Sequence, residues 1–244
     1  TITVEGVTTI TSFDVTLDTR NLILNGGGSF NNQALILSNN ATLTISEDQM
    51  LSILSNFEGI SGENGMIINH GIIEKNETGY CYFTSPLTNT GVININEGVL
   101  EIAANANIIM NHVGAVINIA SGCSFTSGTH ATQNFTNSAI NGEGTFLIHE
   151  TFGNPTVVNL LSGNSIGVKV VVGTATLNLL HNNELANIEL GDFSTIGGAG
   201  TMTIPPNGIA KVPYGCQTTI NCPFINQGRL VVEQGYFKAN NIFV

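Results

Sequence analysis

The stretch from Asn69 to Ile102 reads NHGIIEKNETGYCYFTSPLTNTGVININEGVLEI. Its apolar residues fall in short runs separated by asparagine and glycine, which is typical of short strands joined by turns. Asn-x-Gly turns end at Gly71 and Gly91, 20 residues apart, and a looser turn ends at Gly114 after a further 23 residues. A unit of this length holds two or three strands. It cannot bury its own apolar face, so successive units must stack.

Internal repeats without gaps support this stacking. An offset of 137 residues aligns 71–98 with 208–235, including glycines, a proline and most apolar positions. An offset of 42 residues, which corresponds to two units, aligns Cys81 with Cys123 and the phenylalanine, threonine and serine that follow each of them. Repeats of this kind are the sequence signature of a solenoid.

The repeats predict an all-β fold, a right-handed parallel β-helix that forms one domain over residues 1–244. We expect roughly ten or eleven coils of 20–23 residues, in a rod on the order of 50 Å long. The right hand is expected because crossovers between parallel strands strongly favour it. An antiparallel sandwich is the alternative fold, and it would need hairpin registers in place of the gapless repeats.

One segment has the signals of a helix. Ser46-Glu-Asp-Gln49 resembles a capping box, and the apolar residues after it extend to Phe57, so we expect a short helical excursion near 46–57. A weaker helix is expected from Asn182 to Ile188.

The segments Ile68–Lys75 and Ser85–Ile102 resemble the repeats of large secreted β-helical surface proteins. These are the adhesin-like and autotransporter-passenger-like proteins, whose repeats alternate an Asn-x-Gly turn with apolar strands. The resemblance is clearest over 66–102 and 200–241. It implies a parallel β-helix in an extracellular or cell-surface setting, and it specifies the fold far better than the function.

The composition excludes several classes of function. Only 9% of residues are charged, the net charge is −11, and the six lysines and arginines are scattered. Nucleic acid binding needs clustered cations, so we expect no nucleic acid partner. No apolar run approaches the length of a membrane-spanning helix, so we expect no membrane insertion. The first residues show no secretion signal.

The carboxylates and histidines form no catalytic constellation in the sequence. Asp14 and Asp18 share one face of a predicted strand, but their Cα atoms would lie about 13 Å apart, beyond the carboxyl separation of a glycosidase. His149 and Glu150 are adjacent on a strand and therefore point to opposite faces. We predict no catalytic residue, no metal site and no cofactor, and therefore no enzyme.

Other motifs are also interpreted as structural. His70 and His112 are predicted to occupy equivalent turns two coils apart. Gly163-Asn-Ser165-Ile-Gly167 matches a nucleophile elbow, but a strand follows it where that motif needs a helix, so it is interpreted as a turn.

Cysteines and asparagines suggest covalent modification. Cys216 and Cys222 are candidates for a disulfide across a tight corner, whereas Cys81 and Cys123 are expected to stack as small buried residues. Asn40, Asn76 and Asn134 each begin an N-glycosylation pattern, which matters only in a glycosylating cell.

The expected function is that of an extracellular structural or adhesive module. Neither end carries an amphipathic capping helix, so we expect the open sheet edges to pair with a neighbouring copy, end to end in a fibre, or to continue into a longer surface protein. A glycan or a host surface is the expected external partner. The alternative is a polysaccharide-active enzyme or a glycan-binding domain on the same scaffold.

Overall fold

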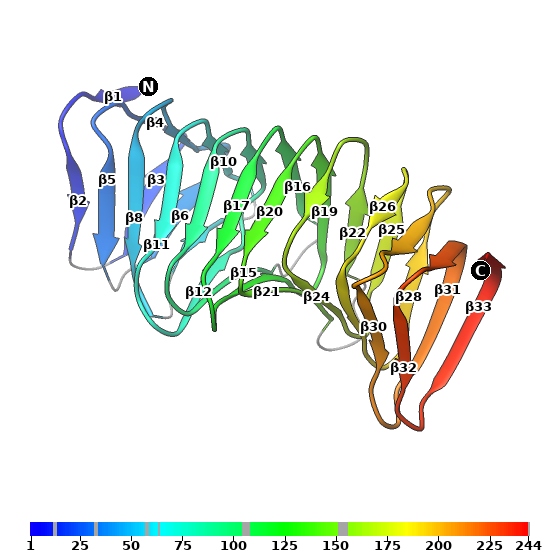
Figure 1. The fold of residues 1–244 in the computed structure, drawn as a ribbon. Helices are drawn as coiled ribbons and strands as arrows, with labels where there is room; N and C mark the ends of the chain where they lie inside the picture. The colour runs from blue at the N-terminus through cyan, green and yellow to red at the C-terminus, as the bar shows by residue number, and fades with distance from the viewer. Residues whose placement is uncertain are drawn as a thin grey trace.

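The computed structural model describes residues 1–11, 14–31, 34–56, 59–62, 64–103, 108–150 and 156–243. These residues form a parallel β-solenoid of three sheets and contain no helix. Figure 1 shows the turns side by side, with the N-terminus at one end of the rod and the C-terminus at the other.

The first sheet receives one strand from each turn. In spatial order its strands are β1 (Ile2–Val4), β4 (Asn21–Leu24), β7 (Thr42–Ile45), β10 (Met66–Asn69), β13 (Leu87–Asn89), β16 (Ile108–Val113), β19 (Ala131–Thr136), β22 (Val157–Leu160), β25 (Thr176–Leu179), β28 (Ser194–Gly197) and the long β31 (Gln217–Asn226), which pairs with β33 (Tyr236–Phe243).

The second sheet has eight strands, which follow the first eight of these strands around the first corner. Its strands are β2 (Thr8–Ile10), β5 (Gly28–Asn31), β8 (Met50–Leu54), β11 (Ile72–Lys75), β14 (Val92–Ile95), β17 (Val116–Ile119), β20 (Ala139–Gly142) and β23 (Ser165–Ile166). The short strands β26 (Asn183–Glu184) and β29 (Met202–Ile204) pair with each other, and β29 pairs with the second half of β31.

The third sheet has 11 strands and completes the turns. They are β3 (Val15–Asp18), β6 (Leu35–Ser38), β9 (Ile60–Ser61), β12 (Tyr80–Phe83), β15 (Val99–Ile102), β18 (Ser124–Ser127), β21 (Thr145–Ile148), β24 (Lys169–Val172), β27 (Asn187–Leu190), β30 (Ile209–Val212) and β32 (Arg229–Val232). The number of strands agrees with the expected ten or eleven coils, and every pairing is parallel, which confirms the predicted β-helix.

The coils vary in length more than the repeats predicted. Asn159 lies 25 residues after its ladder neighbour Asn134, whereas Asn178 lies only 19 residues after Asn159. Turns at the corners absorb the difference, because only the strands must stay in register for the sheets to form.

The core fills the interior of the rod. Inward-facing residues alternate with outward-facing ones along each strand, as in β14, where Ile93 and Ile95 are fully buried and Val92 and Asn94 are not. Ile93 stands between Ile73 and Ile117 in successive turns. Ile93 therefore packs on a like side chain above and below it.

The predicted turn glycines stack at one corner. A Cβ atom on Gly91 would lie 2.1 Å from the carbonyl oxygen of Gly71, so only glycine fits. Gly228 stands in the same way over the oxygen of Gly208, which supports the 137-residue repeat. The turn spacing in the sequence suggested that Gly114 belongs to the same column, and this is wrong. The amide of Val116 donates to Gly91, so Ala115 takes the place of the glycine in this turn.

The expected helical excursion near 46–57 is wrong for the residues that the structure describes. Met50–Leu54 is strand β8, paired with both β5 and β11. The Ser46 hydroxyl donates to the side chain of Asn25 on the previous turn instead of capping a helix, and Asp48 adopts a left-handed φ of 60°. Phe57 lies outside the described residues. The weaker helix at Asn182–Ile188 is also absent, because strands β26 and β27 occupy it.

The 42-residue offset also fails in detail. Cys81 pairs with Leu100, which pairs with Phe125, so Cys123 lies two positions away from the column of Cys81. Both cysteines are buried as expected, but they do not stack. Side chains must follow the strand register, and the unequal turn lengths displace that register from any constant offset. None of the described segments is a helix that could cross a membrane.

Replacing Ile117 by alanine tests the packing of the core. Ile117 is fully buried in the middle of the rod, so Ile117→Ala should lower the free energy of unfolding by about 2–5 kcal/mol. Val116→Ala, on the outward face of the same strand, is the matched control and should cost about 1 kcal/mol or less. Chemical denaturation of both variants measures the difference, and equal losses would contradict the inward assignment.

Candidate functional site

A ladder of asparagines runs along the outer face of the first sheet. Asn134 donates to Asn111 at 2.9 Å, Asn159 donates to Asn134 at 2.8 Å, and Asn178 donates to Asn159 at 3.0 Å. Each amide serves as donor to one turn and acceptor for the next. These side chains hold adjacent turns together, because their hydrogen bonds are used within the rod.

A second polar chain crosses the outer face of the second sheet. Asn118 donates to Asn94 at 2.9 Å, and Asn94 donates to the Glu74 carboxylate at 3.3 Å. Asn76 donates to the other oxygen of the same carboxylate at 3.1 Å. The carboxylate of Glu74 therefore acts as an acceptor for two turns of the scaffold.

A third polar chain lies inside the rod and contains His112. Asn69 donates to Asn89 at 2.8 Å, Asn89 lies 3.3 Å from Nδ1 of His112, and Nε2 of His112 lies 3.1 Å from Oε1 of Gln133. The His112 ring stacks on Phe135 with a centroid distance of 4.4 Å. His112 is thus a core residue in strand β16 and not a turn residue, which corrects the prediction from the sequence. Burial lowers the pKa of His112 to about 4.

Acid should weaken the fold through His112. The pKa is about 4 in the folded chain and about 6.5 in the unfolded chain, so the unfolded chain binds the proton more readily between these values. As the pH falls through this window, the wild-type free energy of unfolding should fall by about 1.4 kcal/mol per pH unit because of this group alone. His112→Gln has no imidazole to protonate, so its free energy of unfolding should not show this part of the decrease.

Urea denaturation between pH 7 and pH 4 measures the effect. The difference in stability between wild type and His112→Gln should shrink as the pH falls, whereas His181→Gln, at an exposed histidine, should stay parallel to wild type. A constant difference for His112→Gln would contradict a buried neutral imidazole.

Lys75 is the second ionisable group in the core. It occupies an inward position of β11, between Ile53 and Ile95, and is fully buried. Its ammonium group donates to the backbone carbonyl of Glu77 at the next corner. Burial lowers the pKa of Lys75, and the neighbouring thiols and carboxylates, Cys81 foremost, partly offset this effect.

Removing the Lys75 charge should stabilise the protein. A buried amine costs free energy that a thioether of similar length does not, so Lys75→Met should raise the free energy of unfolding at pH 7 by about 1–3 kcal/mol. Lys238→Met, at an exposed position of β33, is the control and should change little. Thermal and urea denaturation measure both, and a loss of stability in Lys75→Met would show that the bond to Glu77 outweighs the burial of charge.

The acidic residues that the sequence analysis rejected as catalytic pairs have separate partners. Asp14 accepts the amide of Ala34 at 3.0 Å, and Asp18 accepts the side chain of Asn39 at 2.7 Å, so each carboxylate binds the following turn. Glu150 lines a shallow pocket of about 120 Å³ with Thr156, Thr174, Ala175, Thr176 and Phe193. His149, in contrast, lies near Glu101 on the third sheet. The adjacent pair therefore serves two different surroundings, as expected.

Ser165 and His70 have local structural partners. Ser165 lies in the two-residue strand β23 and donates its amide to Ser138, and strand β24 follows shortly after, so no nucleophile elbow is present there. Nδ1 of His70 lies 2.8 Å from the Thr90 hydroxyl at an exposed corner.

Cys216 and Cys222 do not form the suggested disulfide in this structure. Strand β31 begins directly after Cys216 and carries Cys222 into the core, so the two residues lie along one extended chain rather than across a tight corner. Backbone geometry would have to change, because a disulfide needs Cα atoms within about 7 Å.

The three glycosylation candidates differ in accessibility. Asn40 lies in an exposed turn beside a hollow lined by Asn64, Met66 and Pro86. The amide groups of Asn76 and Asn134 are used in the polar chains described above. Of the three, only Asn40 lies outside these chains.

A patch on the third sheet brings together residues that the sequence did not connect. We call it the tyrosine–glutamate patch: Tyr80, Tyr82, Glu101, Thr126 and His149. Tyr82, Glu101 and Thr126 are direct neighbours in three successive strands. Tyr80 and Tyr82 stack with centroids 6.0 Å apart and planes at 11°.

The carboxyl group of Glu101 is the only one on this patch. Burial raises the pKa of Glu101, and the imidazole of His149 partly offsets the rise. Burial, together with Glu101 and Tyr80, also raises the pKa of the Tyr82 phenol. Periodicity alone could not reveal this neighbourhood, because Glu101 follows Tyr82 by one of the shortest turns and Thr126 follows Glu101 by one of the longest.

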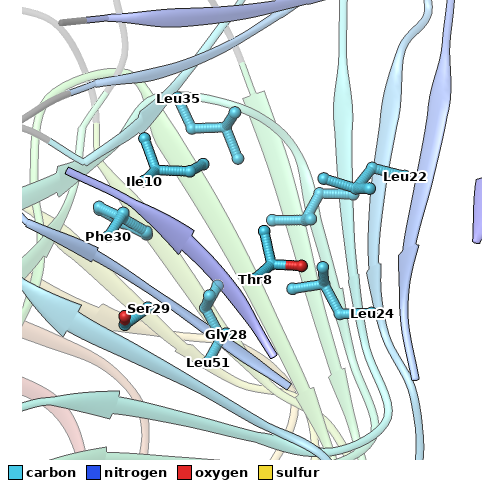
Figure 2. A pocket seen from close by; sticks show the side chains of 10 residues that line it. Thr8, Ile10, Leu22, Leu24, Gly28, Ser29, Phe30, Leu35 and Leu51 are labelled. Carbon is cyan, nitrogen blue, oxygen red and sulfur yellow. The ribbon is translucent and has the colours of Figure 1, made fainter. Parts of the chain in front are cut away.

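A small apolar gap lies under the first turns. It measures about 10 Å³, and Ile10, Leu22, Leu24, Phe30 and Leu35 are among its lining residues. Figure 2 shows these side chains around the gap, with Thr8 among them. The gap is at the lower limit for one water molecule and is lined almost entirely by apolar groups, so it is a packing defect rather than a ligand site.

Among the described residues, no three histidine, cysteine, aspartate or glutamate side chains lie close enough together to hold a metal ion. Comparison with protein-family models, with curated proteins and with solved structures gives no match.

Proposed function

We propose that this chain is a structural or adhesive module outside the cell, built to stack end to end with another copy of itself. The observation that carries the proposal is the incomplete burial of the first turn. Its inward side chains Val4, Ile10 and Val15 pack against the core but remain partly exposed, whereas their counterparts deeper in the rod are fully buried. Ile2 and Val7 are 47% and 77% exposed.

The backbone of the first turn points to the same partner. Among the described residues, strands β1, β2 and β3 each pair with a neighbouring strand on one side only. An unpaired parallel edge above a partly exposed apolar core is a template for a further turn of the same architecture. The strands of a second copy stacked on this turn would continue all three sheets.

The polar faces support a scaffold role rather than catalysis. The amides of the asparagine ladder and the carboxylate of Glu74 bind neighbouring turns, so they strengthen the rod and are not poised for proton transfer.

The charge balance sets a condition for assembly. The net charge is −11, so copies repel one another at low ionic strength. Salt screens this repulsion, and stacking should therefore increase with ionic strength.

A proline in the free edge of β2 tests the proposal. The amide of Thr8 donates to the carbonyl oxygen of Gly27 on the next turn. The amide of the following residue, Thr9, therefore points to the opposite side of the strand, which is the free edge. Wild type should form linear assemblies that lengthen with protein and salt concentration, and Thr9→Pro should shorten or abolish them because it removes that donor. Thr9→Val keeps the donor and is the matched control.

Sedimentation velocity and negative-stain electron microscopy measure the assemblies. A wild-type protein that stays monomeric at all protein and salt concentrations would contradict end-to-end stacking. Assemblies that persist unchanged in Thr9→Pro would place the contact elsewhere on the rod.

A polysaccharide-active enzyme is the second candidate function, and Glu101 is the observation that favours it. A half-buried carboxyl group with a raised pKa is suited to donate a proton. Glycosidic cleavage also needs a second carboxyl group about 5–9.5 Å away. The group whose charge affects the pKa of Glu101 is the imidazole of His149 and not a second carboxyl group. We therefore favour saccharide binding over cleavage.

A further inference from the structure

The tyrosine–glutamate patch has the composition of a ligand site rather than of a scaffold surface. Elsewhere, outward polar side chains on neighbouring turns bind one another, as in the asparagine ladder. Here the hydroxyl of Thr126, directly beside Glu101 in register, is buried and has no hydrogen-bond partner in the part of the chain that the structure describes. The described ion pairs, Lys169 with Glu189 and Lys211 with Glu233, do not include Glu101.

The backbone brings the Glu101 carboxyl into a fixed position. Gly128 lies at the next corner, and a Cβ atom there would be 2.5 Å from Oε1 of Glu101. The absence of a side chain at residue 128 therefore lets the carboxyl group lie against the backbone. The Thr156 hydroxyl oxygen lies 2.7 Å from the carbonyl oxygen of Gly128 and 3.1 Å from that of His149, so its single hydrogen is shared between the two sides of this corner.

The tyrosines supply a preformed aromatic surface next to the carboxyl group. Tyr80 is 46% exposed, and its ring is held by stacking on Tyr82. Two aligned rings on one strand lose little conformational freedom when a ligand packs against them. Their apolar surface and phenolic hydroxyls suit a ligand that carries both C–H and O–H groups.

We propose that the tyrosine–glutamate patch binds an uncharged saccharide, with Tyr80 and Tyr82 packing against the sugar ring and Glu101 accepting its hydroxyl groups. This inference rests on the adhesive role proposed above and gives that role a ligand class. The carboxyl group and the net charge of −11 disfavour an anionic glycan.

An array of immobilised neutral oligosaccharides of glucose, galactose and mannose tests the proposal with the full chain. Wild type should bind a subset of them, and calorimetry with the best oligosaccharide should confirm binding in solution. Tyr80→Ala and Glu101→Gln should each weaken binding about tenfold or more, since a lost stacking contact or charged acceptor is worth on the order of 1.4 kcal/mol or more. Tyr80→Phe, which keeps the ring, should retain most of the affinity.

Matched controls separate binding from folding and from assembly. Tyr236→Ala removes a similarly exposed tyrosine from strand β33 and should leave binding unchanged. Gly128→Ala, which displaces the Glu101 carboxyl, should weaken binding while Tyr80 remains in place. All variants should unfold at the wild-type temperature or within a few degrees of it.

Each other outcome overturns the inference. No binding to any neutral oligosaccharide would do so, as would binding that Tyr80→Ala and Glu101→Gln leave unchanged. Binding of an immobilised lysine-rich peptide in place of the saccharides would replace the ligand class. The patch lies on the third sheet and the free edge of β2 on the second, so the two proposals fail separately. Linear assembly without saccharide binding would contradict the saccharide site alone. Saccharide binding without linear assembly would contradict end-to-end stacking alone.

Discussion

The parallel stacking of one turn on the next is the constraint on which the rest of this structure depends. Each backbone strand pairs with the strand one turn away, so every inward side chain is placed above a counterpart from an earlier turn. Burial then becomes a property of columns rather than of single residues. Ile73, Ile93 and Ile117 form such a column, and the asparagines on the outer face of the first sheet form another.

This constraint explains why polar residues occur in the core. Asn69, Asn89, His112 and Gln133 are tolerated inside the rod because each turn presents the next with a hydrogen-bonding partner. Lys75 has no like neighbour, since Ile53 and Ile95 flank it, and its ammonium group turns instead to a corner carbonyl. The first arrangement is held by hydrogen bonds between turns, although Oδ1 of Asn69 and Nε2 of Gln133 have no partner among the described residues, whereas the second depends on one local bond.

The same register creates the tyrosine–glutamate patch. No scaffold column continues through Tyr82, Glu101 and Thr126, because the three side chains differ in chemistry and do not bind one another in the way the asparagines do. A break in the pattern of like upon like marks the part of the surface that the scaffold does not need.

The sequence by itself determined the class of fold, the approximate length of a turn and the corner glycines at Gly71 and Gly91, because strand alternation and tight turns are local properties. It did not determine where His112, Gly114 or Cys123 would lie, since turns of unequal length displace the register from a constant offset. It also indicated a helix at Ser46, where local capping signals were overruled by pairing of β8 with strands on both sides. The neighbours of Glu101 were decided only by the tertiary structure, because hydrogen bonding between turns, and not spacing along the chain, sets which side chains meet.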